Sequence, residues 1–283
     1  TVTNSGGSTI SGVISGDTAL VKAGTSRLTT SANNTYTGGT TVNAGTLFGG
    51  AASRSNNVFG TGSISVASGA TLLIDRSDDG ALTNALTLNG GTLRGTNGFG
   101  QYWDGNITLG AHSTIKADYN LIIDGVISGS SKNLTKTGNG NLLLRGNNTY
   151  TGSTTISAGT LTLSGSGNLG AGSYAGAIAN SGVFKFDTSA NLISTGVISG
   201  SGNVLVTGTG TYEPKATNTY TGGTVIDGGI IAAFTDRNWG ALPGSVDPDN
   251  IILKNGGKAI FGSENSSNTA GHTYWAANRG INL

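Results

Sequence analysis

The stretch LTKTGNGNLLLRGNNTYTGSTTISAGTL, residues 134–161, decides the fold, because partial copies of it recur on both sides. Each copy has three signals in fixed order: GVISG, then NTYTG, then a closing corner that reads AGTL or GGII. The copies span about residues 10–47, 123–161 and 194–231. The interval from the Val of GVISG to the Tyr of NTYTG is nearly constant, and the interval from that Tyr to the closing Gly is identical in all three copies. Internal repetition held in such register predicts a repeat architecture.

The composition favours many short strands joined by tight turns. The chain has 50 Gly and 3 Pro among its 283 residues, without a collagen-like period, and its apolar residues are largely β-branched or Leu in short runs. Glycine interrupts every segment that could otherwise form an amphipathic helix. No apolar run approaches the roughly 20 residues that a membrane-spanning helix needs, so we expect no membrane insertion in this segment.

Short strands with one apolar side cannot bury that side alone, so they must stack coil on coil. A coil of roughly 20 residues holds about three such strands, and equivalent strands of successive coils then pair in parallel. We therefore predict an all-β, right-handed parallel β-helix (β-solenoid), elongated, with one segment over residues 1–283. A β-sandwich and a propeller are the alternatives, but both favour antiparallel hairpins and a more aromatic core. The alternation predicts these inward side chains: Val13, Val42, Leu47, Ile64, Val126, Ile127, Leu143, Ile156, Leu161, Val197, Val225 and Ile252.

Residues 75–122 form an insertion relative to the shortest copy spacing. GVISG occurs at 12–16, 125–129 and 196–200, so the first interval is much longer than the second. The insertion keeps the pattern of strand, glycine turn and strand. Its least repeat-like part, GTNGFGQYWDG at 95–105, is predicted to be a loop that leaves the stack.

The copies resemble a known repeat of bacterial surface proteins. GNGNLLLRGNNTYTGSTTISAGTL, SRLTTSANNTYTGGTTVNAGTL and GTYEPKATNTYTGGTVIDGGII are similar to the autotransporter-associated β-strand repeat, also called the passenger-associated transport repeat, of autotransporter passengers. The resemblance implies a right-handed parallel β-helix at the cell surface or outside a Gram-negative cell. It also implies a place in large surface or secreted fibrous proteins.

The residues needed for catalysis are missing from the sequence pattern. His112 and His272 have no partner at metal-ligand spacing, no GxSxG motif exists, and the 14 Asp and Glu are scattered singly or in pairs. We predict no catalytic residue, no metal site and no cofactor. A polysaccharide-degrading β-helix enzyme is the weaker alternative, and it would need converging carboxylates on one face. A net charge of +1 gives no footprint for nucleic acid.

Two aromatic pairs and the last residues are the candidate contact sites. Tyr102 with Trp103, and Tyr274 with Trp275, could stack on glycans or a partner as in an adhesin module, or could instead cover the solenoid. Neither end of the chain reads as a cap, and Ile281 and Leu283 resemble the start of a new apolar strand. We therefore expect a longer fibre, continued covalently or by end-to-end self-association. The predicted role is a non-enzymatic structural rod for adhesion, cohesion or matrix building at the bacterial surface.

Overall fold

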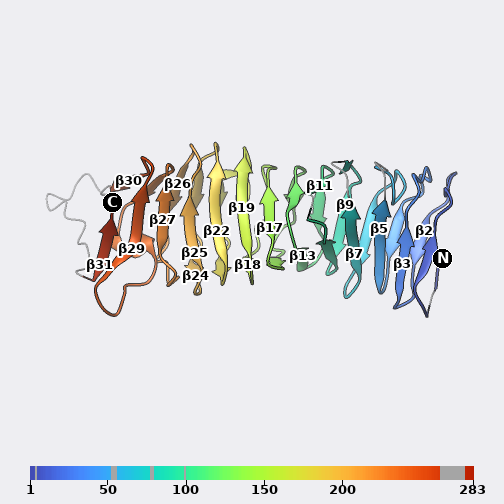
Figure 1. Cartoon of the computed structure of the whole chain (residues 1–283), viewed down its shortest axis with the longest axis horizontal. Helices are drawn as coiled ribbons and strands as arrows, with labels where there is room; N and C mark the ends of the chain where they lie inside the picture. Colours follow the sequence, from blue (N-terminus) through green and yellow to red (C-terminus); the bar gives the residue numbers. More distant parts are fainter. Residues whose placement is uncertain (4, 52–55, 77–79, 99, 262–277) are drawn as a thin grey trace.

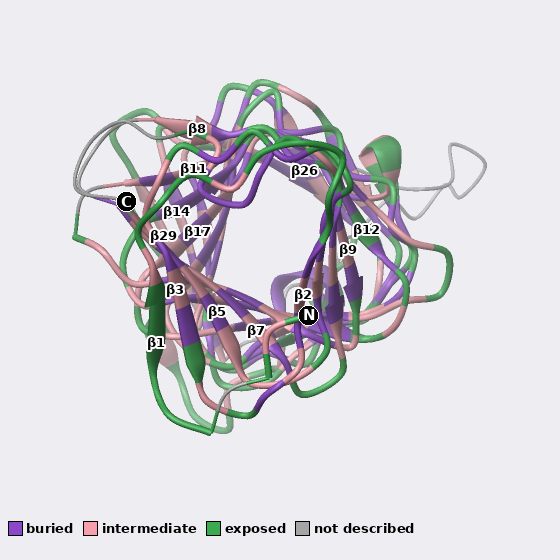
Figure 2. Ribbon diagram, turned by 90° about the vertical axis from the view of Figure 1, so that its right-hand side faces the viewer, coloured by how far each residue is buried: buried purple, intermediate pink, exposed green. Residues whose placement is uncertain are grey.

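The chain forms an elongated three-sided stack of β-strands (Figures 1 and 2). A computed structural model describes residues 1–283 except 4, 52–55, 77–79, 99 and 262–277. The only helical elements in the described part are two short 3₁₀ turns, η1 (Gly170–Gly172) and η2 (Asp236–Trp239). The chain runs from one end of the rod to the other (Figure 1). No helix among the described residues is long and apolar enough to span a membrane.

Face I of the rod is a ten-stranded sheet. Its strands, in spatial order, are β1 (Ser8–Ile10), β3 (Arg27–Thr30), β5 (Thr46–Ala51), β7 (Thr71–Arg76), β10 (Thr92–Gly95), β13 (Ser113–Ala117), β16 (Leu134–Thr137), β18 (Thr154–Ile156), β21 (Ile178–Asn180) and β24 (Ile198–Ser199).

Face II is a second ten-stranded sheet. Its strands, in spatial order, are β8 (Ala81–Leu82), β11 (Gln101–Trp103), β14 (Leu121–Ile123), β17 (Asn141–Leu144), β19 (Thr160–Gly165), β22 (Val183–Thr188), β25 (Asn203–Val206), β27 (Thr224–Asp227), β29 (Asp247–Lys254) and β31 (Arg279–Asn282).

Face III consists of two sheets that follow each other along the rod. The six-stranded sheet contains β2 (Leu20–Lys22), β4 (Thr40–Val42), β6 (Ile64–Ala67), β9 (Leu86–Asn89), β12 (Ile107–Leu109) and β15 (Ile127–Ser128). The five-stranded sheet contains β20 (Ser173–Tyr174), β23 (Leu192–Ser194), β26 (Thr211–Pro214), β28 (Ile230–Ala233) and β30 (Lys258–Phe261).

The strand pairing is that of a solenoid. Every pairing between these named strands is parallel, and register partners lie one coil apart along the chain, as Arg27 and Thr46 do in a short coil and Ile230 and Lys258 in a long one. The remainder of each coil is the crossover that parallel pairing requires. This confirms the predicted all-β solenoid with parallel strands. The right-handed coil stays a prediction, in line with the general preference of parallel crossovers.

The core consists of in-register columns of apolar side chains. Leu28, Leu47, Leu72, Leu93 and Ile115 stack on one another behind face I, and all five are buried. Burial of each such side chain contributes roughly 1.5 to 3 kcal/mol. Because side chains alternate along a strand, the neighbours of these residues point outward, and many of them are polar.

Half of the inward positions predicted from the sequence are wrong. Val42, Leu47, Ile64, Ile127, Ile156 and Leu161 are buried as predicted. Val13 and Val197 are exposed, at 62% and 40%, and Val126, Leu143, Val225 and Ile252 are only half-buried. In most of these cases the inward residue is the direct neighbour of the predicted one, because adjacent side chains in a strand point to opposite faces. In the second and third GVISG signals, for example, Ile127 and Ile198 face inward and the preceding Val does not.

The insertion 75–122 belongs to the stack. It supplies β8 to β14, one strand after another to the three faces. The segment 95–105, predicted to leave the stack as a loop, instead contains β11, which pairs with β8 on one side and β14 on the other. Trp103 is inward on this strand, in register with Leu82 and Ile123, and its burial fixes the segment in the core.

Candidate functional site

The asparagine of each NTYTG signal connects three successive coils. In the central copy the Oδ1 atom of Asn148 accepts a hydrogen bond from the N–H of Ile127 at 2.8 Å, one coil earlier. Its Nδ2 atom donates to the carbonyl of Asn168 at 2.9 Å, one coil later. Asn34 bonds Ile14 and Val58 in the same way, at 2.9 Å each. We call this arrangement the asparagine bridge.

The third copy has the same bridge. Asn218 accepts from the N–H of Ile198 at 2.8 Å and donates to the carbonyl of Asn238 at 2.7 Å. Each first partner is the Ile of a GVISG signal, so GVISG and NTYTG are adjacent because they lie on consecutive coils. This explains why the sequence keeps the two signals about one coil apart.

The tyrosine of each NTYTG signal is structural, as predicted. Tyr36, Tyr150 and Tyr220 are buried, and each hydroxyl bonds the threonine four residues later. The partners are Thr40, Thr154 and Thr224, at 2.5, 2.8 and 2.6 Å. Burial raises the pKa of Tyr36 and Tyr220 to about 12 and that of Tyr150 well above its usual value. These hydroxyls serve the core and are not accessible to a ligand.

Two buried lysines, which the sequence pattern did not indicate, close the corners of the first two copies. Lys22 and Lys136 occupy the same place relative to the motif Tyr and are fully buried. The Lys136 Nζ atom donates to the carbonyls of Thr137 and Ala158, each at 3.0 Å, and Lys22 donates to that of Ala44 at 3.1 Å. Burial lowers the pKa of Lys136 to about 8 and also lowers the pKa of Lys22. The third copy has Val206 at this position.

The three copies are turned relative to one another about the rod axis. The strand that follows NTYTG is β4 on face III in the first copy, β18 on face I in the second and β27 on face II in the third. The repeat copies thus share the same contacts between coils, but they do not lie on the same side of the rod. A ligand that lies along one side cannot meet all three copies, so the copies do not form one shared binding surface.

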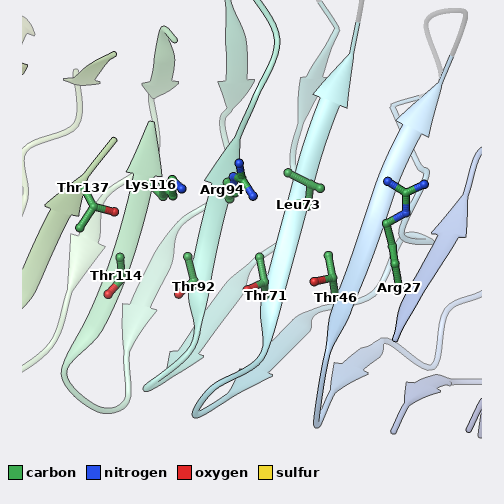
Figure 3. Close-up of a pocket in the computed structure, with 9 residues that line it drawn as sticks. All are labelled: Arg27, Thr46, Thr71, Leu73, Thr92, Arg94, Thr114, Lys116 and Thr137. Carbon is green, nitrogen blue, oxygen red and sulfur yellow. The ribbon is translucent and has the colours of Figure 1, made fainter. Parts of the chain in front are cut away.

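A groove on the outside of face I is the best candidate for a binding site. It has a volume of about 510 Å³ and crosses six consecutive strands, β3, β5, β7, β10, β13 and β16 (Figure 3). Five strand spacings make it about 24 Å long. The groove is lined by Arg27, Thr46, Thr71, Leu73, Thr92, Arg94, Thr114, Lys116 and Thr137.

The floor of the groove is a ladder of threonines in register. Thr46, Thr71, Thr92 and Thr114 occupy equivalent positions on β5, β7, β10 and β13, and all four are half-buried. Among the residues that the structure describes, none of their hydroxyls bonds another protein group. By contrast, the threonines four residues after each motif tyrosine use their hydroxyls to bond that tyrosine. The ladder therefore presents one available donor and acceptor per coil.

The charge of the groove is positive, because its lining contains three cations and no carboxylate. At its edge Asp118 pairs with Arg94, whose Nε atom and one Nη atom lie 2.8 and 2.7 Å from the same carboxylate oxygen. The Lys116 Nζ atom lies 3.6 Å from the other oxygen. Arg27 stacks on the ring of Phe48, 5.0 Å from its centroid, towards the other end of the groove.

A second carboxylate lies beside the groove and does not cancel this charge. Asp75 is in the same row as Asp118 and accepts hydrogen bonds from Thr96 at 3.0 Å and Asn97 at 2.9 Å. Counted together, the three cations and the two carboxylates still leave an excess of one positive charge. The three cations line the groove itself (Figure 3), whereas Asp75 and Asp118 are not among the residues that line it.

The first aromatic pair is divided between the inside and the outside of the stack. Trp103 is fully buried, so from this position its side chain has no surface to offer a glycan. Tyr102 is half-buried on the outside of face II, and Tyr274 and Trp275 lie outside the described residues. The groove was missed from the sequence because its residues come from six different strands, and only the register of the coils brings them together.

The remaining predicted positions lie at the rod's C-terminal end. Ile281 is 39% and Leu283 92% exposed. β31 is the outermost strand of face II, and Ile281 pairs with Ile251 of β29. Buried Arg279 holds β31 in place through a 2.7 Å ion pair with Asp236 and a 3.0 Å bond to the carbonyl of Trp239. In the described part of the chain, no three His, Asp or Glu side chains gather as a metal site would require.

Known protein families contain the repeat that the sequence shows. The family model described as "Passenger-associated-transport-repeat" matches residues 20–47 and 134–163, which contain the two buried lysines. The chain contains passenger-associated transport repeats. This repeat protein is also similar to "Adhesin BmaC autotransporter" of Brucella suis biovar 1 (strain 1330), at 36% identity over 155 residues. That similarity covers 54% of this chain and 4% of the relative's length. No solved structure matches the chain significantly.

Proposed function

We propose that this chain is a non-enzymatic, stiff segment of a bacterial surface adhesin, which carries contact surfaces along a continuous rod. The observation that carries this proposal is the asparagine bridge, which connects three coils at a time in each repeat copy. Such bonds serve cohesion between coils, which is the property that a stiff rod needs. The similarity to the Brucella protein, which is named as an adhesin autotransporter, supports the same role and a cell-surface or secreted location.

The adhesive role is tested with the whole chain on a surface. Beads coated with residues 1–283 should attach to animal cells or to bacterial cells more than beads coated with albumin at equal density. Equal attachment of the two kinds of bead to every cell type would remove the adhesive part of the proposal. Release of oligosaccharides from a panel of polysaccharides by the purified chain would remove the non-enzymatic part.

The rod also offers an edge for end-to-end assembly with a second copy. β31 ends face II with exposed Ile281, and backbone groups of such an edge can pair with another strand. We propose that this edge continues the stack in a fibre. Light scattering should show concentration-dependent growth that Ile281→Asp abolishes while Ile281→Val preserves it. Growth that is the same in both variants would exclude this edge.

A further inference from the structure

The groove on face I has properties that the stiff rod does not require. Its threonine hydroxyls are unused within the described structure, its lining is cationic, and it runs across six coils. The four threonines of the ladder could be valines without loss of a described hydrogen bond, since β-branched residues suit such a strand equally well. The combination of available hydroxyls and surplus positive charge indicates a ligand with both hydroxyl and anionic groups.

The positions of the charges decide between a small and an extended ligand. Arg27 on β3 and Arg94 on β10 are three strand spacings apart, which is about 14 Å, and Lys116 follows one spacing further. A single phosphate or sulfate cannot reach both ends. A polymer whose negative charges recur at intervals can meet both ends at once, and its uncharged parts then lie on the threonine ladder and Leu73 (Figure 3).

We propose that the groove of face I binds an extended anionic polysaccharide, with its chain parallel to the rod axis. Arg27, and Arg94 together with Lys116, bind its carboxylate or sulfate groups, and the four threonines of the ladder bond its hydroxyls. Asp118 holds Arg94 in position, and Lys116, at the longer 3.6 Å distance, is the cation more readily shared with a ligand. This inference rests on the proposed adhesive function and deepens it by assigning a ligand class.

The test uses the whole chain and defined polymers. Alginate supplies carboxylates, dextran sulfate supplies sulfates, and unmodified dextran is the neutral probe. Binding by calorimetry should be measurable for one or both anionic polymers, absent for dextran, and weaker at higher salt because the contacts are ionic. Failure of both anionic polymers to bind overturns the proposal, and the bead attachment described above then still reports separately on the adhesive role.

Two sets of variants with equal charge loss locate the site. The triple variant Arg27→Gln, Arg94→Gln, Lys116→Gln should weaken binding by about a hundredfold or more, since charge-assisted contacts are the strong ones. The control triple variant Lys185→Gln, Lys215→Gln, Lys254→Gln removes three ion-paired lysines outside the groove and should change the affinity less than about threefold. Equal loss in both sets means unspecific charge attraction and overturns the assignment.

Variants of the threonine ladder distinguish binding of a polysaccharide from binding of other polyanions. Thr71→Val with Thr92→Val keeps the shape and charge of the groove, so binding of alginate should weaken about tenfold while the fold is unchanged. Single-stranded DNA provides the competing polyanion. If DNA binds as tightly as the polysaccharides and the threonine variant does not distinguish them, the groove is a general polyanion surface and the polysaccharide assignment fails.

Discussion

The side-chain oxygen of Asn148 accepts the backbone N–H of Ile127 at 2.8 Å, across one full coil of the chain. Both residues are fully buried, so neither group has water as an alternative partner. A buried donor left without a partner costs about 1 to 3 kcal/mol. The bond therefore makes the spacing of GVISG and NTYTG a stability requirement.

Replacing the bridging asparagine should destabilise the rod. Asn148→Ala leaves the N–H of Ile127 and the carbonyl of Asn168 without this partner, and we expect a loss of about 2 to 4 kcal/mol in the free energy of unfolding. Denaturant unfolding gives this value. The matched control is Asn106→Ala, which removes an exposed bond of 3.0 Å from the Val126 N–H to the Asn106 side chain and should cost under about 1 kcal/mol. Equal costs would contradict a special role for burial.

The buried tyrosine hydroxyl should contribute measurably to stability and titrate late. Tyr150→Phe removes its bond to Thr154 and should cost about 1 kcal/mol, whereas Tyr119→Phe, at a residue 55% exposed, should cost almost nothing. The folded pKa of Tyr150 is raised above the usual 10.0, so its stabilisation is complete below about pH 10 and is lost as the pH rises further. Absorbance of the phenolate, followed as the pH rises, measures when Tyr150 loses its proton. A pKa near 10 for Tyr150 in the folded protein would contradict this prediction.

The buried lysine should give the opposite pH dependence in a lower range. The pKa of Lys136 is about 8 in the folded chain against 10.5 for an ordinary lysine, so between these values the unfolded state binds more protons and stability rises with pH. Below about pH 8 the lysine is charged in both states, and burial of that charge lowers the stability throughout this range. Unfolding measured from about pH 7.5 to 10 should show the rise, before tyrosine ionisation reverses it.

Lys136→Val tests the source of that rise. The third copy already has Val206 at this position, so the backbone accepts valine. The variant should lose most of the rise between about pH 8 and 10, with Lys22 supplying the remainder. Lys185→Val, which changes a half-buried lysine on the outside of face II, is the control and should retain it. A rise of unchanged size in Lys136→Val would show that another group is responsible.

Two glycines with positive φ, Gly159 of the closing corner and Gly165 at the end of β19, should differ in their tolerance of alanine. Gly159 has φ +66°, and a Cβ atom there would contact the carbonyl oxygen of Gly140 in the neighbouring coil. Gly165 has a similar φ of +64° but open space around it. Gly165→Ala should cost about 1 to 2 kcal/mol from backbone conformation alone, and Gly159→Ala clearly more, because the coils must also separate. Thermal or denaturant unfolding measures both, and equal costs would show that the coil contact is not tight.

The sequence predicts the solenoid well because its signals are coil-to-coil contacts. Asn148 makes a side-chain hydrogen bond to an adjacent coil, and Gly159 lies too close to an adjacent coil for a Cβ atom. Only these residue types allow these contacts, so the repeat copies remain recognisable in the sequence. The sequence predicts less well which residues of each strand point into the core. Leu142, Leu143 and Leu144 are equally apolar, and composition alone cannot show that the middle one points outward.

The candidate groove could not be found from the sequence for a related reason. Thr46, Thr71 and Thr92 are unequally spaced along the chain, and such unequal coils hide a ladder that only the strand register defines. The burial of Trp103 was not foreseen because an aromatic residue beside glycines suits an exposed loop as well as a strand in the core. The buried lysines were overlooked because a charged residue in a Thr-rich and Gly-rich stretch is normally solvated.

The turning of the repeat copies has a mechanical consequence. Bending a rod stretches one side and compresses the other, so a rod fastened along a single side would be weak against loads from the opposite direction. Here the strands that follow the three motifs lie on faces III, I and II in turn. The three asparagine bridges therefore lie on different sides of the rod and at different places along it, so no single side carries all of this bonding between coils.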